Sequence, residues 1–144
     1  CDYSAAITSE LIGPSGYLVT MERIPELAEL AKSNLESHFG KGRFFGKGLE
    51  KRLKVIFNEK DGSIDSVPDA REALFDRIYL TAGVNSTFDP SILAKQLKPD
   101  GGVLLFPEER GSLIRIRYRD GKPAGEPEKY GNVSFVPLVI GKNS

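Results

Sequence analysis

The segment "LVTMERIPELAELAKSNLE", residues 18–36, changes its hydrophobic periodicity in the middle. Residues 17–21 are mostly apolar, which predicts a short strand. Residues 24–39 repeat apolar side chains every three or four positions, which predicts an amphipathic helix. Pro25 suits the first turn of that helix, where a missing N–H leaves no bond unmade. A strand that leads directly into a helix is the building unit of α/β folds, and Glu22 stands at this junction.

The rest of the chain continues the alternation of helices and strands. The sequence "KPDGG", residues 98–102, is a strong break that should end a helix. The last two predicted strands should form an antiparallel hairpin that turns near Asp120-Gly121. This pattern predicts one α/β domain over residues 1–144, with a mainly parallel sheet and an antiparallel hairpin at its C-terminal end. The other predicted helices cover residues 4–12 and 90–97, and the other strands cover residues 53–57, 75–80, 103–106, 113–118 and 132–140.

Composition narrows the class of protein. The 20 basic residues balance the 20 acidic ones, so net charge does not indicate a nucleic acid or an anionic membrane as partner. The single cysteine, Cys1, cannot form an internal disulfide, which fits a reducing compartment. We find no apolar run of about 18 residues and no signal-peptide pattern, so we expect a cytoplasmic protein. His38, the one histidine, lies on the predicted apolar helix face, and the sequence shows no cluster of metal ligands.

Parallel strands of an α/β sheet bind ligands at their carboxyl ends. That rule places Glu22, Asp61-Gly62 and the Thr81-Ala82-Gly83 turn on one rim. An acidic residue that ends the second strand of a nucleoside-binding fold accepts hydrogen bonds from both ribose hydroxyls. Glu22 fits this role, and Asp61 could contact the adenine. Two plainer interpretations stay open, namely a solvated carboxylate near a helix N-terminus for Glu22 and an ordinary turn for Asp61.

Five motifs in order, "ERIPELAELAKSNLE", "DG", "FDRIYLTAGV", "LAKQLKPDGGVLLFP" and "VSFVPL", resemble those of protein-L-isoaspartate O-methyltransferases. The resemblance covers nearly the whole chain. It implies a Rossmann-like sheet with helices on both faces and S-adenosylmethionine as the methyl donor. It also implies methylation of the free carboxylate of isoaspartyl residues in damaged proteins, a repair reaction.

The resemblance also assigns roles to residues. The turn at Thr81-Ala82 would position donor and acceptor, and the edge formed by Val136, Pro137 and Leu138 would offer backbone groups to an extended peptide. Catalysis would come from alignment, because the acceptor is already anionic and needs no general base. The implied contacts to the cofactor are Asp2, Tyr3, Glu22, Arg23, Asp61, Gly62 and Thr81.

Alignment to the family places Cys1-Asp2-Tyr3 on the last three positions of a glycine-rich cofactor turn. We therefore expect the first strand, the earlier glycines and an upstream substrate loop to lie outside the 144 residues, which would not fold alone. Asp2 occupies a position where the family typically has glycine. The sequence "NEKDG" occurs where the family tends to have "VGDG", and "AGVN", which includes Asn85, occurs where the family tends to have "AAAP". These departures leave open a divergent methyltransferase-like protein that binds S-adenosylmethionine without this activity.

Other functions fit the sequence less well. The basic, aromatic-containing residues 41–54 could serve an RNA methyltransferase, although such a stretch is typical of a solvated loop. An amine methyltransferase would need an Asn/Asp-Pro-Pro-aromatic turn where "TAGVN" stands. A dehydrogenase that uses NAD would need a proton-relay histidine. We expect a monomer.

Overall fold

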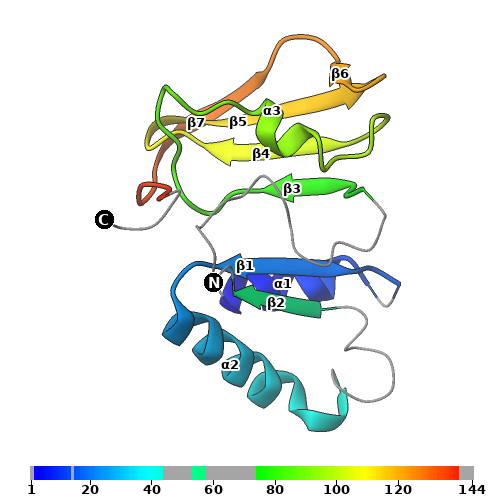
Figure 1. Ribbon diagram of the computed structural model, residues 1–144, viewed down its shortest axis with the longest axis vertical. Helices are drawn as coiled ribbons and strands as arrows, with labels where there is room; N and C mark the ends of the chain where they lie inside the picture. The colour runs from blue at the N-terminus through cyan, green and yellow to red at the C-terminus, as the bar shows by residue number, and fades with distance from the viewer. Residues whose placement is uncertain (1, 14, 44–52, 58–73, 140–144) are drawn as a thin grey trace. The chain divides into compact units, whose positions relative to one another are not determined.

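The computed structural model describes residues 2–13, 15–43, 53–57 and 74–139. It divides into two compact units, Cys1–Gly62 and Ser63–Ser144, which are described separately below (Figure 1). Each unit contains a helix and paired strands, so the predicted mixed α/β class is confirmed. One domain over residues 1–144 stays a prediction.

The N-terminal unit is a two-stranded parallel sheet with two helices. Its strands pair in register from Leu18 opposite Leu53 to Glu22 opposite Phe57. Both helices contact the first strand and contact each other (Figure 1). In chain order the elements are α1 (Asp2–Leu11), β1 (Leu18–Glu22), α2 (Pro25–Arg43) and β2 (Leu53–Phe57).

The predicted apolar face of α2 packs as its periodicity indicates. Ala28, Ala31 and Leu35 are buried, and their spacing of three and four residues places them on one helix face. Leu27 is 46% exposed, so it lies at the border of the buried stripe rather than within it. Pro25, predicted to lie in the first turn, is the first residue of the helix, and the helix continues to Arg43 rather than ending at residue 39.

The C-terminal unit is a sheet in the order β3-β4-β5, with β6 and β7 both paired to β5. The β3–β4 pair is parallel, and the pairs that β5 makes are antiparallel. The short helix α3 lies over the sheet in Figure 1. The elements are β3 (Arg77–Tyr79), α3 (Ser91–Ala94), β4 (Val103–Pro107), β5 (Arg110–Arg119), β6 (Lys122–Pro123) and β7 (Glu128–Ser134).

One face of this sheet forms the core of the unit. Alternate residues of β4 and β5 are buried, with Leu104 completely inaccessible. Burial of one face fits an antiparallel sheet in which apolar and polar side chains alternate along each strand. The rings of Phe88 and Phe106 pack edge to face, with 5.3 Å between the ring centroids. The buried cluster consists of Val84, Leu93, Leu97, Leu104, Phe106, Ile114, Ile116 and Tyr118.

Most predicted elements have different bounds in the structure. The last strand, predicted over residues 132–140, is β7 at Glu128–Ser134, because residues 128–130 pair with β5 before Gly131. The strand predicted over residues 75–80 narrows to β3, which pairs with β4 alone among the described residues. The helix predicted over residues 90–97 shortens to α3, and the first helix begins at residue 2 rather than 4.

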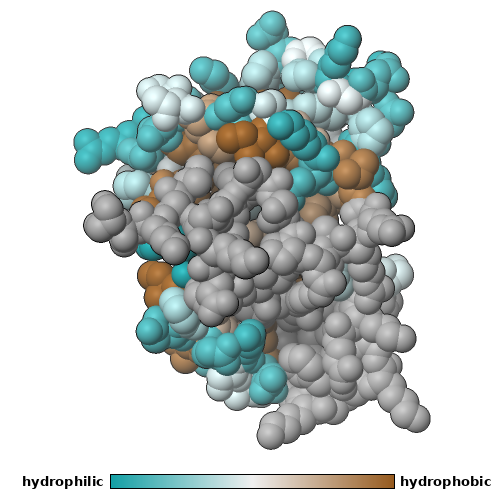
Figure 2. All heavy atoms as spheres, viewed as in Figure 1, coloured by the Kyte–Doolittle hydropathy of each residue, from teal (hydrophilic) through white to brown (hydrophobic). Residues whose placement is uncertain are grey.

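Two further observations concern the polarity of the surface and of the helices. Hydrophilic side chains outline much of the visible surface of the C-terminal unit, with apolar atoms between them (Figure 2). Across residues 2–13, 15–43, 53–57 and 74–139, the structure contains no helix with the length and apolar character that a membrane crossing requires.

Candidate functional site

Glu22 is the last residue of β1 and is half-buried. Its Oε1 accepts hydrogen bonds from the backbone N–H groups of Arg23, at 2.8 Å, and of Ile24, at 3.0 Å. The carboxylate therefore lies over the chain that enters α2, where backbone donors have no partner within the helix. No hydrogen bond within the described parts of the chain engages Oε2. The predicted carboxylate thus stands at the carboxyl end of a parallel strand, and its Oε2 has no hydrogen-bond partner among the residues that the structure describes.

The carboxyl end of β2 lies beside Glu22. The two strands are parallel, and Glu22 is opposite Phe57, the last residue of β2. Asp61 and Gly62, which follow β2 in sequence, lie outside the described residues, as do residues 44–52 of the basic segment. The structure therefore brings the ends of β1 and β2 to one rim, and the role of Asp61 stays a prediction.

Asp2 and Tyr3 form the first turn of α1. Tyr3 is 73% exposed. Cofactor contact by these two residues and by Arg23 stays a prediction.

The predicted acceptor turn follows β3 in the C-terminal unit. Thr81 is exposed and Ala82 is half-buried, whereas Gly83 is buried. The Gly83 N–H donates to the Val136 carbonyl, and the Leu138 N–H donates to the Gly83 carbonyl, both at 2.7 Å. The structure therefore joins the predicted positioning turn to the predicted substrate edge by two short backbone hydrogen bonds.

Gly83 has a structural role that the sequence reasoning missed. A Cβ at this position would lie 2.6 Å from the Cα and 3.0 Å from the backbone nitrogen of Glu109. Two further hydrogen bonds hold the neighbouring segments of the chain together, from Val84 N–H to the Pro107 carbonyl at 2.8 Å and from Glu109 N–H to the Val84 carbonyl at 3.0 Å. Only glycine fits this approach without a backbone shift. The glycine itself, at a predicted ligand-binding turn, was the available signal.

Asn85, one of the departures from the expected family pattern, forms hydrogen bonds within its own loop. Its Oδ1 accepts hydrogen bonds from the Thr87 backbone N–H at 3.0 Å and from the Thr87 hydroxyl at 2.6 Å. This arrangement is an Asx turn, in which a side chain replaces a backbone acceptor. Asn85 therefore shapes the loop after the acceptor turn.

Two backbone groups of the predicted substrate edge already form hydrogen bonds within the protein. Val136 C=O and Leu138 N–H are bonded to Gly83, and alternate residues of an extended chain direct their backbone groups to opposite sides. Neither Pro137 C=O nor Val139 N–H bonds to Gly83, and Pro137 has no N–H to donate. The side chains of Val136 and Val139 are 72% and 42% exposed.

Two carboxylates in the C-terminal unit have lowered pKa values. The Arg115 guanidinium donates to Glu128 on the neighbouring strand, which lowers the pKa of Glu128 and raises that of Arg115. The Tyr130 hydroxyl donates to the same Glu128 carboxylate at 2.9 Å. Hydrogen bonds from the Ser91 hydroxyl and backbone lower the pKa of Asp89 before α3. These groups stabilise the β5–β7 pair and the start of α3, outside the acceptor turn.

Within the described residues, His, Cys, Asp and Glu form no group of three that could hold a metal ion.

Comparison with known proteins identifies the family. A family model for protein-L-isoaspartate(D-aspartate) O-methyltransferase matches residues 1–143. A protein-L-isoaspartate O-methyltransferase from Methanopyrus kandleri is 34% identical over 139 residues, covering 95% of this chain and 54% of the relative. Its counterpart from Methanococcus vannielii is 38% identical over 138 residues, covering 95% and 57%.

Protein-L-isoaspartate O-methyltransferase 1 from Archaeoglobus fulgidus is 35% identical over 138 residues, covering 96% of this chain and 55% of the relative. The chain thus spans little more than half the length of these curated relatives. Because the family match extends over almost every residue, including β1 with Glu22 and the turn that Gly83 pins, the chain belongs to the protein-L-isoaspartate O-methyltransferase family.

Proposed function

We propose that the protein carrying this chain transfers a methyl group from S-adenosylmethionine to the free carboxylate of isoaspartyl residues in damaged proteins. Family membership together with Glu22 at the carboxyl end of β1 carries the proposal. We further propose that the sheet has a Rossmann-like arrangement with helices on both faces, and that the protein is cytoplasmic and monomeric.

The residues around Glu22 fit an adenosine sugar. Two backbone N–H groups fix Oε1, so the carboxylate keeps one orientation before a ligand arrives. Oε2 can then accept a hydrogen bond from a ribose hydroxyl. Charge-assisted bonds of this kind contribute about 1.5–3 kcal/mol each. S-adenosylmethionine, when bound, supplies the methyl group on its sulfonium. Asp2, Tyr3, Arg23, Asp61, Gly62 and Thr81 are the other residues that we propose to hold it.

The acceptor turn would position the substrate carboxylate. The hydrogen bonds of Gly83 and Val84 fix the backbone after Thr81 and Ala82 from two sides. The acceptor carboxylate of an isoaspartyl residue has a pKa far below neutrality, so these residues need only orient an existing anion. Holding reacting groups in alignment can lower a barrier by roughly 7–11 kcal/mol.

The substrate edge would hold the peptide chain beside the turn. Because Gly83 occupies one side of this segment, we propose that the peptide bonds to the other side, through Pro137 C=O and Val139 N–H. One acceptor and one donor on this side suffice for a single pair of backbone bonds. The exposed Val136 side chain adds apolar surface for the peptide.

The test measures methyl transfer by the protein that carries residues 1–144. Labelled S-adenosylmethionine is incubated with a peptide that contains one isoaspartyl residue and, as the matched control, with the same peptide containing normal aspartate. We expect a base-labile methyl ester on the isoaspartyl peptide alone. Cofactor binding without transfer to the isoaspartyl peptide would support the divergent, inactive alternative and reject the proposal.

A further inference from the structure

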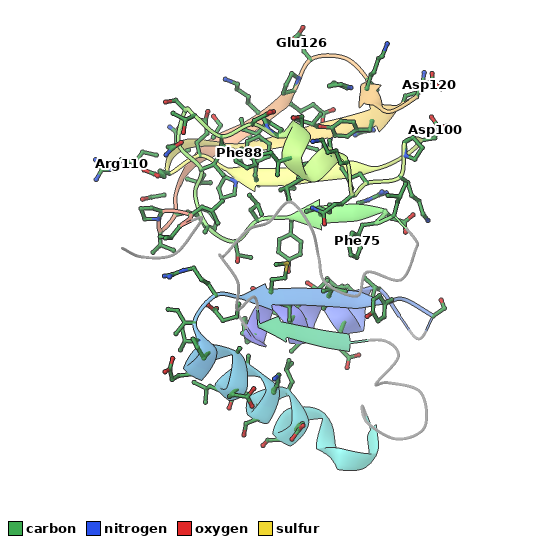
Figure 3. The ribbon with its side chains drawn as sticks, in the orientation of Figure 1. Phe75, Phe88, Asp100, Arg110, Asp120 and Glu126 are labelled. Atoms are coloured by element: carbon green, nitrogen blue, oxygen red, sulfur yellow. The ribbon has the colours of Figure 1, made fainter. Side chains whose placement is uncertain are left out.

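Two Asp-Gly sequences lie at the same end of the C-terminal sheet. Asp100-Gly101 precedes β4, and Asp120-Gly121 connects β5 to β6; Figure 3 shows Asp100 and Asp120 close together there. All four residues are exposed. Both sequences form tight turns with left-handed backbone, with φ of 81° at Gly101, 49° at Asp120 and 69° at Gly121.

Asp-Gly is the dipeptide in which aspartate isomerises most readily, because glycine has no side chain to hinder the attack. The glycine nitrogen loses its proton and bonds to the aspartate Cγ. The Cγ–OH bond breaks, water leaves, and a succinimide ring forms. Water then opens the ring. Attack at the backbone carbonyl carbon gives an isoaspartyl linkage, and attack at the side-chain carbonyl carbon restores aspartate. No cofactor or enzyme takes part in these steps.

The backbone of the two turns holds both attacking nitrogens. Gly101 N–H donates to the Tyr118 carbonyl, next to the second turn, at 3.1 Å. Gly121 N–H donates to the Pro99 carbonyl, within the first turn, also at 3.1 Å. An amide that donates to a carbonyl must break that bond before it can lose its proton. Each turn therefore restrains the nucleophile of the other.

Side chains add to this restraint. Oδ1 of Asp100 accepts the backbone N–H of Asp120 at 2.8 Å, which directs that carboxylate toward the other turn. The Arg77 guanidinium donates to the Gly101 carbonyl, and also to the Asp76 carbonyl, at 2.8 Å each. Arg77 therefore anchors the first turn to the start of β3.

We propose that Asp100-Gly101 and Asp120-Gly121 form an interlocked pair of latent isomerisation sites. While the bonds between the turns are intact, isomerisation is suppressed at both. Local opening releases both glycine amides together, because the bonds are mutual. Isomerisation at either turn then removes the geometry that protects the other, so damage at this end of the sheet is coupled.

The first test compares folded and denatured protein. Both are incubated at neutral pH and physiological temperature, then digested, and each peptide is compared with synthetic aspartyl and isoaspartyl standards by chromatography and mass spectrometry. We expect isoaspartate at residues 100 and 120 to form at least about tenfold more slowly in the folded protein, because only locally opened molecules react. Equal rates in the two states would overturn the proposal.

Variants test the coupling. Asp100→Ala removes the acceptor for Asp120 N–H, so we expect several-fold faster isomerisation at Asp120 in the folded protein and an unchanged rate in denaturant. Glu126→Ala removes an exposed carboxylate from the next loop (Figure 3) and should leave the rate unchanged.

A second variant covers the case in which Asp100→Ala does not fold. Arg77→Ala should accelerate isomerisation at Asp100, while Arg110→Ala, at the opposite end of the sheet in Figure 3, should not. Folded variants that isomerise at the wild-type rate would show that the turns do not protect each other.

Discussion

The close approach at Gly83 gives a prediction whose size follows from the structure. In Gly83→Ala, the new Cβ would lie 2.6 Å from the Glu109 Cα, whereas ordinary contacts begin at 3.4 Å. One backbone must therefore move by about 0.8 Å. Backbone hydrogen bonds of 2.7–3.0 Å hold both segments, so neither moves freely. Overpacking of this kind destabilises a protein by about 1–3 kcal/mol.

Urea unfolding measures the loss. The experiment uses the protein that carries residues 1–144, and far-UV circular dichroism follows the loss of its helices and strands. With a denaturant dependence of about 2 kcal/mol per molar urea, the unfolding midpoint should fall by about 0.5–1.5 M. Ser86→Ala, at an exposed position in the same loop, should leave the midpoint unchanged. A Gly83→Ala midpoint equal to that of the wild type would refute the close contact with Glu109 and the pinned acceptor turn derived from it.

Three further changes test other parts of the structure. Glu22→Gln should weaken S-adenosylmethionine binding at least about tenfold, since one charge-assisted bond contributes about 1.5–3 kcal/mol; unchanged affinity by calorimetry would remove Glu22 from the site. Arg115→Gln should raise the pKa of Glu128 toward its ordinary value of 4.5 in an NMR titration. In the wild type, the stability that Glu128 contributes is present above the pKa of Glu128 in the unfolded chain and is lost as the pH falls through its lower pKa in the folded protein. If the pKa of Glu128 did not change in Arg115→Gln, the ion pair between the two residues would be contradicted. Leu104→Ala, at a completely buried position, should lower the free energy of unfolding by about 2–5 kcal/mol; a loss below about 1 kcal/mol in urea unfolding would argue against the central position of Leu104 in the core.

Local patterns were sufficient to predict the elements whose stability is local. The strand at residues 53–57 has the predicted bounds, because an apolar run lies between polar segments. Helix α2 begins at Pro25, where the fixed φ of proline suits the first turn. Asp120-Gly121 forms the predicted hairpin turn, since both residues tolerate left-handed backbone.

Non-local pairing explains what the sequence could not predict. Strand β7 begins at Glu128 because Arg115, thirteen residues earlier on β5, pairs with it across the sheet. Nothing in the polar stretch before Gly131 predicts this pairing. Likewise, the role of Gly83 depends on Glu109 and Val136, which approach it only in the folded chain.

Glu22 shows why position alone could not decide between a structural and a binding role. Its Oε1 accepts two backbone N–H groups at the entrance to α2, which satisfies donors that need a partner whether or not a ligand is present. A glutamine keeps one carbonyl oxygen that can accept the same two hydrogen bonds, but its amide nitrogen cannot accept a hydrogen bond from a ribose hydroxyl. Glu22→Gln therefore separates the two roles. A loss of affinity with unchanged stability identifies Oε2 as the ligand-binding atom, whereas unchanged affinity together with unchanged stability leaves Glu22 only its role as a helix-terminal acceptor.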